Sequence, residues 1–334
     1  MSHEIESMAW TNEVPWHGLG IEMDPNATPR EWMKVSGLDW AVERVPMEAT
    51  LPNGTRVTVE GKSDNEYGIL VRTKKNNTHD VFGPVGPEWV PVQNHEVFDF
   101  LKRFCDASSM KMETCGSLKG GTEIWALCKF ADDFEPIKGD PFKGYLLFHS
   151  AHVWGKGNQL RVTPIRVVCN NTLTMALRAG NKGQVVRMPH IKEFSTDVQD
   201  LAIEALGLAE HQIKDFADIV THLSSRKYNA DTLDEFITRL YCPNNIIENV
   251  DNENLREYFT PSADNVLEAI TKAPGAELKG SKGTWWGAFN GVTYHEDHMR
   301  ISYKDDSNIL ASSWFGGGAK KKQKALDMAM EYAA

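Results

Sequence analysis

The sequence predicts an α+β protein: a curved, mostly antiparallel sheet with a crossing helix, followed by a helical C-terminal region. Two observations predict this class. Before residue 190, segments of alternating apolar residues are joined by glycine-containing turns, which is typical of β-hairpins. After Ser195, apolar residues recur three and four positions apart, which is typical of helices. We therefore divide the chain into a mostly β region, 1–190, and a mostly helical region, 191–334.

The first elements are short. Residues 28–36 predict a helix, with Thr28 as N-cap, Pro29 at the first helical position and Glu31 completing a capping box. Asn94 is suited to cap a second helix that extends to about Cys105. Strands are expected between these helices, with a turn at 51–54, over residues 38–47, 55–61 and 67–73.

The central segment contains the clearest hairpins. Strands 111–118 and 123–130 are joined by a Lys-Gly-Gly-Thr turn, and strands 144–153 and 159–168 turn at 154–157. The last strand passes directly into Asn170 and Asn171, whose side chains suit a helix N-cap, so we expect a helix to about residue 179. One more strand is expected at 185–190.

Helical periodicity dominates the remaining chain. It predicts helices over residues 195–223, 231–240, 261–272 and 325–332. Residues 283–298 fit either a strand pair or a helix. We favour the helix, because the apolar residues Trp285, Phe289 and Val292 follow helical spacing.

Composition is ordinary for a globular protein of 334 residues, with 41% hydrophobic and 25% charged residues. No run of about 18 apolar residues predicts a membrane span, and the N-terminus lacks the features of a signal peptide. We therefore expect a cytoplasmic protein. The five cysteines are odd in number and lack a C-x-x-C pair, which argues against a disulfide framework or a cysteine zinc site.

The net charge of −10 disfavours nucleic acid at first. However, residues 193–264 contain 15 acidic and 5 basic side chains, and the rest of the chain holds 31 of each. The excess acid therefore lies in one predicted helical segment, and the other regions can still present a basic groove.

The end of the chain predicts an anion site. Trp314 precedes a glycine turn that includes Gly317 and Gly318, and lysines follow directly at the start of the expected basic helix. Helix N-termini carry free N–H groups and partial positive charge, which suit phosphate. The alternative is a flexible turn beside a solvated helix face. The lysines are Lys320, Lys321, Lys322 and Lys324.

A second basic candidate follows the strand at 159–168. Alternation places Arg161 on the face opposite Leu160, and Lys156 and Arg166 are near it in sequence. These three cations either line a groove for a nucleic-acid backbone or are simply solvated.

Other candidates have competing structural explanations. Trp16 and His17 either contact phosphate or pin the N-terminal arm to the body of the protein, and we favour the second. Asn170 and Asn171 either contact bases or cap a helix, and we favour capping. His298 lies in the only dense group of potential metal ligands, but a metal needs convergent ligands from elsewhere, so we assign no metal.

Motifs for nucleotide-driven chemistry are missing. The chain has no G-x-x-x-x-G-K-[ST], no G-x-G-x-x-G after a strand, no H-E-x-x-H and no G-x-S-x-G. We assign no catalytic residue and no cofactor, and we expect a non-enzymatic protein.

Three ordered landmarks resemble the phage and plasmid family called domain of unknown function 932. They are Pro-Trp-His-Gly-Leu-Gly at 15–20, Arg-Val-Val-Cys-Asn-Asn-Thr-Leu at 166–173 and Trp-Trp-Gly-Ala-Phe-Asn-Gly-Val-Thr-Tyr at 285–294. Gly291 stands where the family pattern suggests alanine. The resemblance implies no established activity. It implies a mobile-element setting, where roles in replication, recombination and evasion of host defence are common.

These observations lead us to expect a DNA-binding protein of a mobile element that binds or anneals single strands, as a homo-oligomer and without a membrane. Strand-annealing proteins loosely resemble the predicted layout of a bent hairpin sheet, a crossing helix and a basic groove. Two alternatives stay open: an anti-defence protein that sequesters a nucleotide or a host protein, and a metal-dependent enzyme.

Overall fold

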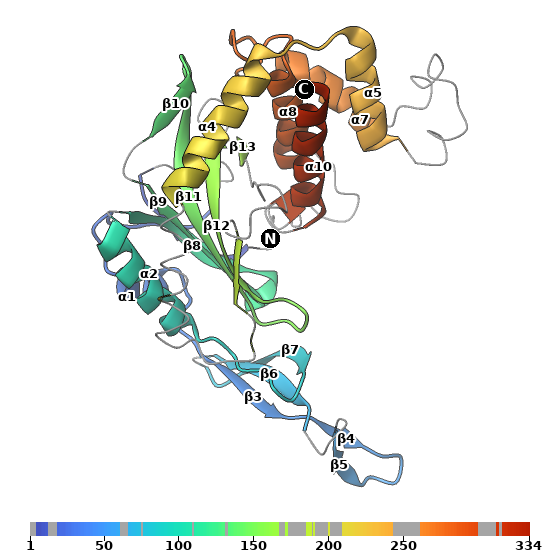
Figure 1. Ribbon diagram of the computed structural model, residues 1–334. Coiled ribbons are helices and arrows are strands. Elements are labelled where there is room, and N and C mark those ends of the chain that lie inside the picture. The colour runs from blue at the N-terminus through green and yellow to red at the C-terminus, as the bar shows by residue number, and fades with distance from the viewer. Residues whose placement is uncertain are drawn as a thin grey trace.

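A computed structural model confirms the α+β class, because a large sheet and two small ones are combined with helices that gather mainly toward the C-terminus (Figure 1). The structure describes residues 5–12, 19–60, 66–74, 76–108, 110–130, 133–166, 171–172, 185–188, 190, 200, 209–242, 261–299, 312–313 and 316–334.

The large sheet has nine strands in the order β13-β12-β11-β9-β8-β1-β2, with β10 paired to β11 and β14 paired to β12. Among the strands that the structure describes in this sheet, only β1 and β2 run parallel. The hairpins β8–β9 and β11–β12 and the strand β14 confirm the sequence predictions. The strands are β1 (Ile5–Trp10), β2 (Ile21–Glu22), β8 (Lys111–Leu118), β9 (Glu123–Lys129), β10 (Phe134–Ile137), β11 (Asp140–Ala151), β12 (Asn158–Arg166), β13 (Asn171–Thr172) and β14 (Val185–Met188).

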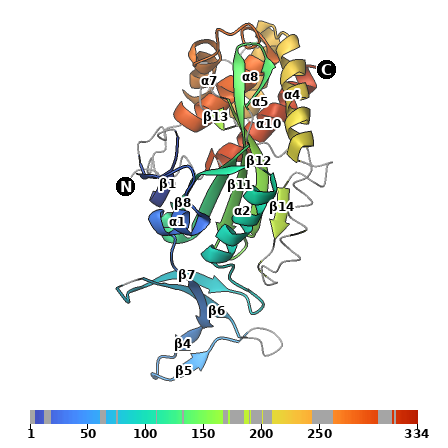
Figure 2. The same ribbon diagram turned by 90° about the vertical axis from the view of Figure 1, so that its left-hand side faces the viewer.

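Two helices cover one face of this sheet: α1 (Pro29–Val35) and α2 (Asn94–Ser108) (Figure 2). Buried side chains of α2 such as Phe98 and Leu101 pack with Leu146 and Phe148 of β11 in one apolar core. The capping box of α1 is confirmed, because Thr28 and Glu31 exchange hydrogen bonds. Asn94 is the first residue of α2 rather than its cap, because the N–H of Val97 donates to the carbonyl of Gln93 at 3.3 Å. The side-chain amide of Asn94 instead donates to the carbonyl of Leu38 at 2.8 Å.

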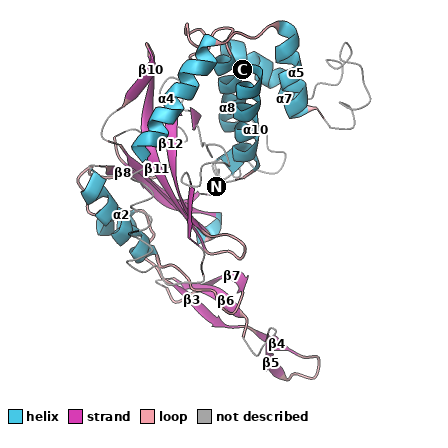
Figure 3. Ribbon diagram, in the orientation of Figure 1, coloured by secondary structure: helices cyan, strands magenta, loops and turns pink. Residues whose placement is uncertain are grey.

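The smaller sheets form an arm. Strands β3 (Val42–Pro46), β6 (Gly68–Thr73) and β7 (His79–Val85) make a three-stranded sheet. The ribbon of β4 (Glu48–Thr50) and β5 (Arg56–Thr58) extends beyond it, away from the large sheet (Figures 1 and 3). All six residues of β4 and β5 are exposed.

The helical region has its own apolar core, built from α4 (Ala209–Ser225), α5 (Ala230–Tyr241), α7 (Pro261–Lys272), α8 (Trp285–Tyr294) and α10 (Gly317–Tyr332). Strand β11 joins this core to the sheet: Phe142 packs against Phe216 at 5.3 Å between ring centroids. Trp286 of α8 donates to the Asp140 carboxylate at 3.2 Å. Helix α8 confirms the helix expected at 283–298, and it continues as a π-helical turn, His295–Met299.

Two local predictions need correction. Asn171 belongs to strand β13, which pairs with β12, rather than to a helix cap; the helix expected after it lies outside the described residues. Helix α10 begins at Gly317 instead of Ala325, so the glycine turn and lysines belong to the helix itself. The boundary at residue 190 stays a prediction. Across the described ranges, no helix combines the length and apolar character that crossing a membrane requires.

Candidate functional site

The start of α10 is held against the preceding segment rather than left open. The N–H of Gly318 donates to Ser312 Oγ at 3.1 Å, and the N–H of Gly316 donates to the Ser312 carbonyl, also at 3.1 Å. A Cβ added at Gly318 would lie 3.1 Å from that carbonyl oxygen, so glycine permits the close approach. Two amides that an anion would use are therefore already bonded.

The four lysines of α10 point to different surroundings. Lys320 is exposed, and Lys321 lies 4.2 Å from the ring centre of Tyr241. Lys324 donates to the carbonyl of Arg239 at 2.8 Å. Lys322, which the sequence offered as a phosphate contact or as part of a solvated helix face, is buried, and its ammonium pairs with Asp297 at 2.7 Å. We therefore do not retain Lys322 in a surface anion site.

The residues after α8 form a buried polar network. The hydroxyl of Tyr241 donates to Glu296 at 3.1 Å, and His295 Nδ1 lies 3.3 Å from the same carboxylate. The ring of His298 lies 4.7 Å from that of Tyr294. Within the described part of the chain, no group of three or more His, Cys, Asp or Glu side chains is arranged to hold a metal ion.

A second polar site lies at the ends of β9 and β11, around the buried carboxylate of Glu123. It accepts from His149 Nε2 at 3.1 Å and from Lys119 at 3.0 Å, and it is also bonded by Lys156. Burial alone would raise the pKa of Glu123, but the hydrogen bonds from His149 and Lys156 outweigh burial and hold it well below its ordinary value. Burial lowers the pKa of His149, so the two lysines balance the carboxylate charge at pH 7.

Two arginines continue this site across the sheet. Arg161 of β12 is opposite Leu147 of β11, and the next strand, β14, carries the exposed Arg187. Burial, together with the charge of Arg187, lowers the pKa of Arg161 to about 10, so its guanidinium stays charged at pH 7. The charges of Arg161 and Lys156 in turn help to lower the pKa of His149, which places these side chains in one neighbourhood. We call Lys119, Lys156, Arg161 and Arg187 the hairpin basic cluster.

The chain around this cluster lacks compensating acid. Residues 151–190 contain six Lys or Arg and no Asp or Glu. Trp154, in the turn between β11 and β12, is 55% exposed and lies 5.9 Å from Tyr67 between ring centroids. An exposed aromatic ring thus accompanies the cations at one end of the hairpin.

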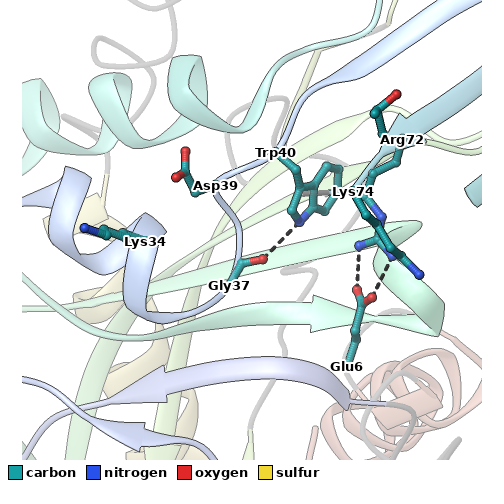
Figure 4. Close-up of a pocket in the computed structure, with 8 residues that line it drawn as sticks. Glu6, Lys34, Gly37, Asp39, Trp40, Arg72 and Lys74 are labelled. Carbon is teal, nitrogen blue, oxygen red and sulfur yellow. Dashed lines mark hydrogen bonds and ion pairs between the residues drawn. The ribbon is translucent and has the colours of Figure 1, made fainter. Parts of the chain in front are cut away.

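A cavity of about 300 Å³, which we call the Trp40 cavity, lies between α1, β1 and β6. Figure 4 shows Lys34 and Asp39 on one side and Trp40, Arg72 and Lys74 on the other. A second cavity of about 370 Å³ shares Lys34 and Asp39. The buried Arg72 lies 4.8 Å from the ring centre of Trp40, while Lys34 and Lys74 are exposed. The cavity therefore offers an indole and two exposed lysines, of which Lys74 pairs with Asp80 at 2.8 Å.

The remaining sequence candidates are only partly placed. Trp16, His17, Asn170 and Trp314 lie outside the described residues. For Arg166, the structure gives the backbone pairing with Phe142 and Asn171. Lys156 and Arg161 are brought together as members of one site. The α10 lysines Lys321, Lys322 and Lys324 instead contact Tyr241, Asp297 and Arg239.

Sequence reasoning missed the carboxylate and histidine at the centre of the cluster. Glu123 and His149 are 26 residues apart and meet only because β9 and β11 pair. Arg187 was missed as well, and for it the composition held a usable signal, because the absence of acid from 151–190 marks the strands that carry Arg161 and Arg187.

Comparison with protein families shows what the chain is similar to. The family model described as "Domain of unknown function (DUF932)" matches residues 81–327. The matched segment contains the whole hairpin basic cluster, whereas the residues lining the Trp40 cavity precede it. Neither a curated protein nor a solved structure gives a significant match to the chain.

Proposed function

The chain belongs to the family described as a domain of unknown function (DUF932), and from the surface of the matched segment we propose that it binds single-stranded nucleic acid. The hairpin basic cluster carries this proposal. Its four cations accompany one ionised carboxylate, Glu123, and residues 151–190 add no acid. Such an excess of positive charge attracts a phosphate backbone.

The exposed ring of Trp154 favours single-stranded over double-stranded nucleic acid as the ligand. Unpaired bases stack on aromatic side chains, and every base offers such a face, so binding of this kind tolerates any sequence. Arg161 and Arg187 would contact successive phosphates while Trp154 holds a base. Affinity should then fall steeply as salt concentration rises.

The proposal extends to strand annealing in a mobile-element setting. The nine-stranded sheet with α2 across one face is similar in layout to strand-annealing proteins, an analogy that concerns layout only. Such proteins work as homo-oligomers, so the mass of the protein in solution should rise when long single-stranded DNA is added. Sedimentation with and without DNA measures this.

The direct test uses fluorescence anisotropy with a labelled single-stranded oligonucleotide at two salt concentrations. Replacing both Arg161 and Arg187 with Gln should weaken binding by roughly tenfold or more. The slope of the logarithm of affinity against the logarithm of salt concentration should fall by the amount expected for about two phosphate contacts. Trp154→Ala should weaken binding while leaving the salt dependence unchanged, because it removes stacking alone.

Lys320→Gln on α10 serves as the matched control, since Lys320 is an exposed cation far along the chain. It should leave the affinity unchanged. Absence of binding at low salt would refute the proposal. Weakened binding in Lys320→Gln, with wild-type affinity in the arginine variant, would move the site to the C-terminal helix.

The Trp40 cavity favours a second candidate function, sequestration of a nucleotide. An indole can stack on a base while Lys34 and Lys74 contact phosphate. Calorimetric titration with nucleoside mono- and triphosphates tests this function. Binding that is lost in a Lys34→Gln, Lys74→Gln double variant but kept in the Arg161, Arg187 variant would assign the nucleotide to the cavity.

A further inference from the structure

Two free thiols face each other between α2 and the sheet. Cys105 lies in the last turns of α2, and Cys128 lies near the end of β9. Their Sγ atoms are 3.6 Å apart, and both side chains belong to the core between α2 and the sheet. Figure 2 shows α2 in front of the large sheet.

The two thiols differ in access and acidity. Cys105 is half-buried, whereas Cys128 is fully buried. The neighbouring thiol of Cys128 lowers the pKa of Cys105, because an S–H donor stabilises the thiolate. The pKa of Cys128 is raised by its proximity to Cys105 and by burial. Reactive redox cysteines combine a stabilised thiolate, access and a nearby second thiol.

We propose that Cys105 and Cys128 form a hydroperoxide-reactive modification site, in which Cys105 is the attacking thiol and Cys128 the resolving thiol. The site goes beyond nucleic-acid binding and depends on neither proposed function. It rests on the Sγ–Sγ distance of 3.6 Å and on the different exposure of the two side chains.

The chemistry balances with hydrogen peroxide as the oxidant. The Cys105 thiolate attacks one peroxide oxygen, the O–O bond breaks, and hydroxide leaves and takes up the thiol proton as water. Cys105 is then a sulfenic acid. The Cys128 sulfur attacks Cys105 Sγ, the S–O bond breaks, and a second water leaves. Two thiols are oxidised to one disulfide, and one peroxide is reduced to two waters.

Closure requires a small movement. A disulfide has an S–S length of about 2.05 Å, so the two sulfurs must approach by roughly 1.5 Å from their present 3.6 Å. Cys105 is three residues before the end of α2 at Ser108. Helix ends fray readily, so the helical side of the pair can supply this movement.

The experiment treats the full-length protein with hydrogen peroxide, blocks remaining thiols with iodoacetamide under denaturing conditions, and maps peptides by mass spectrometry. The expected product has lost two hydrogens, has two fewer alkylated cysteines, and contains a Cys105–Cys128 linked peptide that a thiol reductant reverses. A linked peptide with any other pairing, or progression of Cys105 to sulfinic acid without a link, would overturn the proposal.

Three variants make the assignment specific. Cys105→Ala should abolish the link, and Cys128→Ala should stop at a Cys105 sulfenic acid that dimedone traps. Cys115→Ala is the control: this thiol is fully buried on neighbouring β8, and burial raises its pKa to about 12. It should cross-link like the wild type. Alanine avoids placing a polar hydroxyl in the core, and circular dichroism verifies folding. Equal cross-linking in Cys128→Ala would also overturn the proposal.

Discussion

The ammonium of Lys322 lies 2.7 Å from Asp297 Oδ1, and both side chains are buried where α10 meets the turn after α8. Ser313 completes the group, because its hydroxyl is 2.8 Å from the same ammonium and bonds to the same carboxylate. A buried charge that loses its partner cannot recover the hydration it had in the unfolded chain. This pair therefore ties the C-terminal helix to the segment that contains the polar network of His295 and Glu296.

Replacing Lys322 with Met should lower the free energy of unfolding by about 3 kcal/mol, since it leaves the Asp297 carboxylate buried without its cation. Urea unfolding at pH 7 measures the change. Lys320→Met, two positions earlier in α10 and exposed, is the control and should change stability by less than about 0.5 kcal/mol. Similar effects in both variants would contradict the buried position of Lys322.

Gly291 marks a close contact between α7 and α8. A Cβ added there would lie 2.3 Å from Ile270 Cγ1 and 2.9 Å from its Cα. Gly291→Ala should therefore destabilise the protein by about 1–3 kcal/mol, because the two helices must separate. Gly86→Ala is the matched control, since a Cβ there meets nothing within 4 Å. Thermal unfolding compares the two; an unchanged midpoint for Gly291→Ala would contradict the packing of α7 on α8.

His152 should make the protein sensitive to acid. It is fully buried beside Phe82 and Trp40, and burial, aided by the charges of His190 and Arg72, lowers its pKa to about 3. The unfolded chain takes up a proton near pH 6.5, whereas the folded chain does not until about pH 3. The stability contributed by the neutral ring is thus complete above pH 6.5 and is lost as the pH falls toward 3.

The loss in the free energy of unfolding amounts to several kcal/mol, because each pKa unit corresponds to about 1.4 kcal/mol. His152→Phe should remove this contribution, so that the stability of the variant falls less as the pH is lowered. Denaturant unfolding at pH 7 and pH 4.5 measures the difference between the two pH values. The exposed His95, changed to Gln, should behave like the wild type. An equally steep loss of stability in His152→Phe would show that other groups cause it.

Arg72 joins the three-stranded sheet to the large one. Its guanidinium donates to both carboxylate oxygens of Glu6 on β1, at 2.6 and 2.9 Å. It also donates to the carboxylate of Asp80 on β7 at 2.8 Å. Arg72→Met should lower the free energy of unfolding by about 2–4 kcal/mol, because two partly buried carboxylates lose their partner. Lys74→Met removes an exposed cation from the same Asp80 and should cost less than about 1 kcal/mol. Equal costs would contradict the joining role of Arg72.

Features encoded by neighbouring residues were predictable from the sequence. The turn at 119–122 fixes the β8–β9 hairpin, whose ends the structure places within one residue of the prediction. Helix α7 has the predicted bounds, and Thr28 caps α1 through local hydrogen bonds. Turn chemistry and caps act over a few residues, so the sequence carries them directly.

Features that depend on distant partners were not predictable. The lysine run has no periodicity that distinguishes Lys322 from Lys320; only the packing of α10 against Asp297 does so. Asn94 has the residue type of a cap, yet its side-chain amide donates to the carbonyl of Leu38, 56 residues away. The candidate site shows the same limit: Arg161 was a sequence candidate, but Glu123 and His149 acquire their relationship only when β9 and β11 pair.

The pairing of β1 with β8 has a consequence for the growing chain. Ile5 pairs with Leu118, so β1 leaves the ribosome more than a hundred residues before its partner strand β8 has been made. At about 5–20 residues per second, this delay lasts several seconds or longer. During that time the arm strands β3, β6 and β7, which are close in sequence, can assemble on their own. Arg72 of the arm would then offer Glu6 an ionic partner before the edge of the large sheet is available, and synthesis order would favour the arm as the first folded unit.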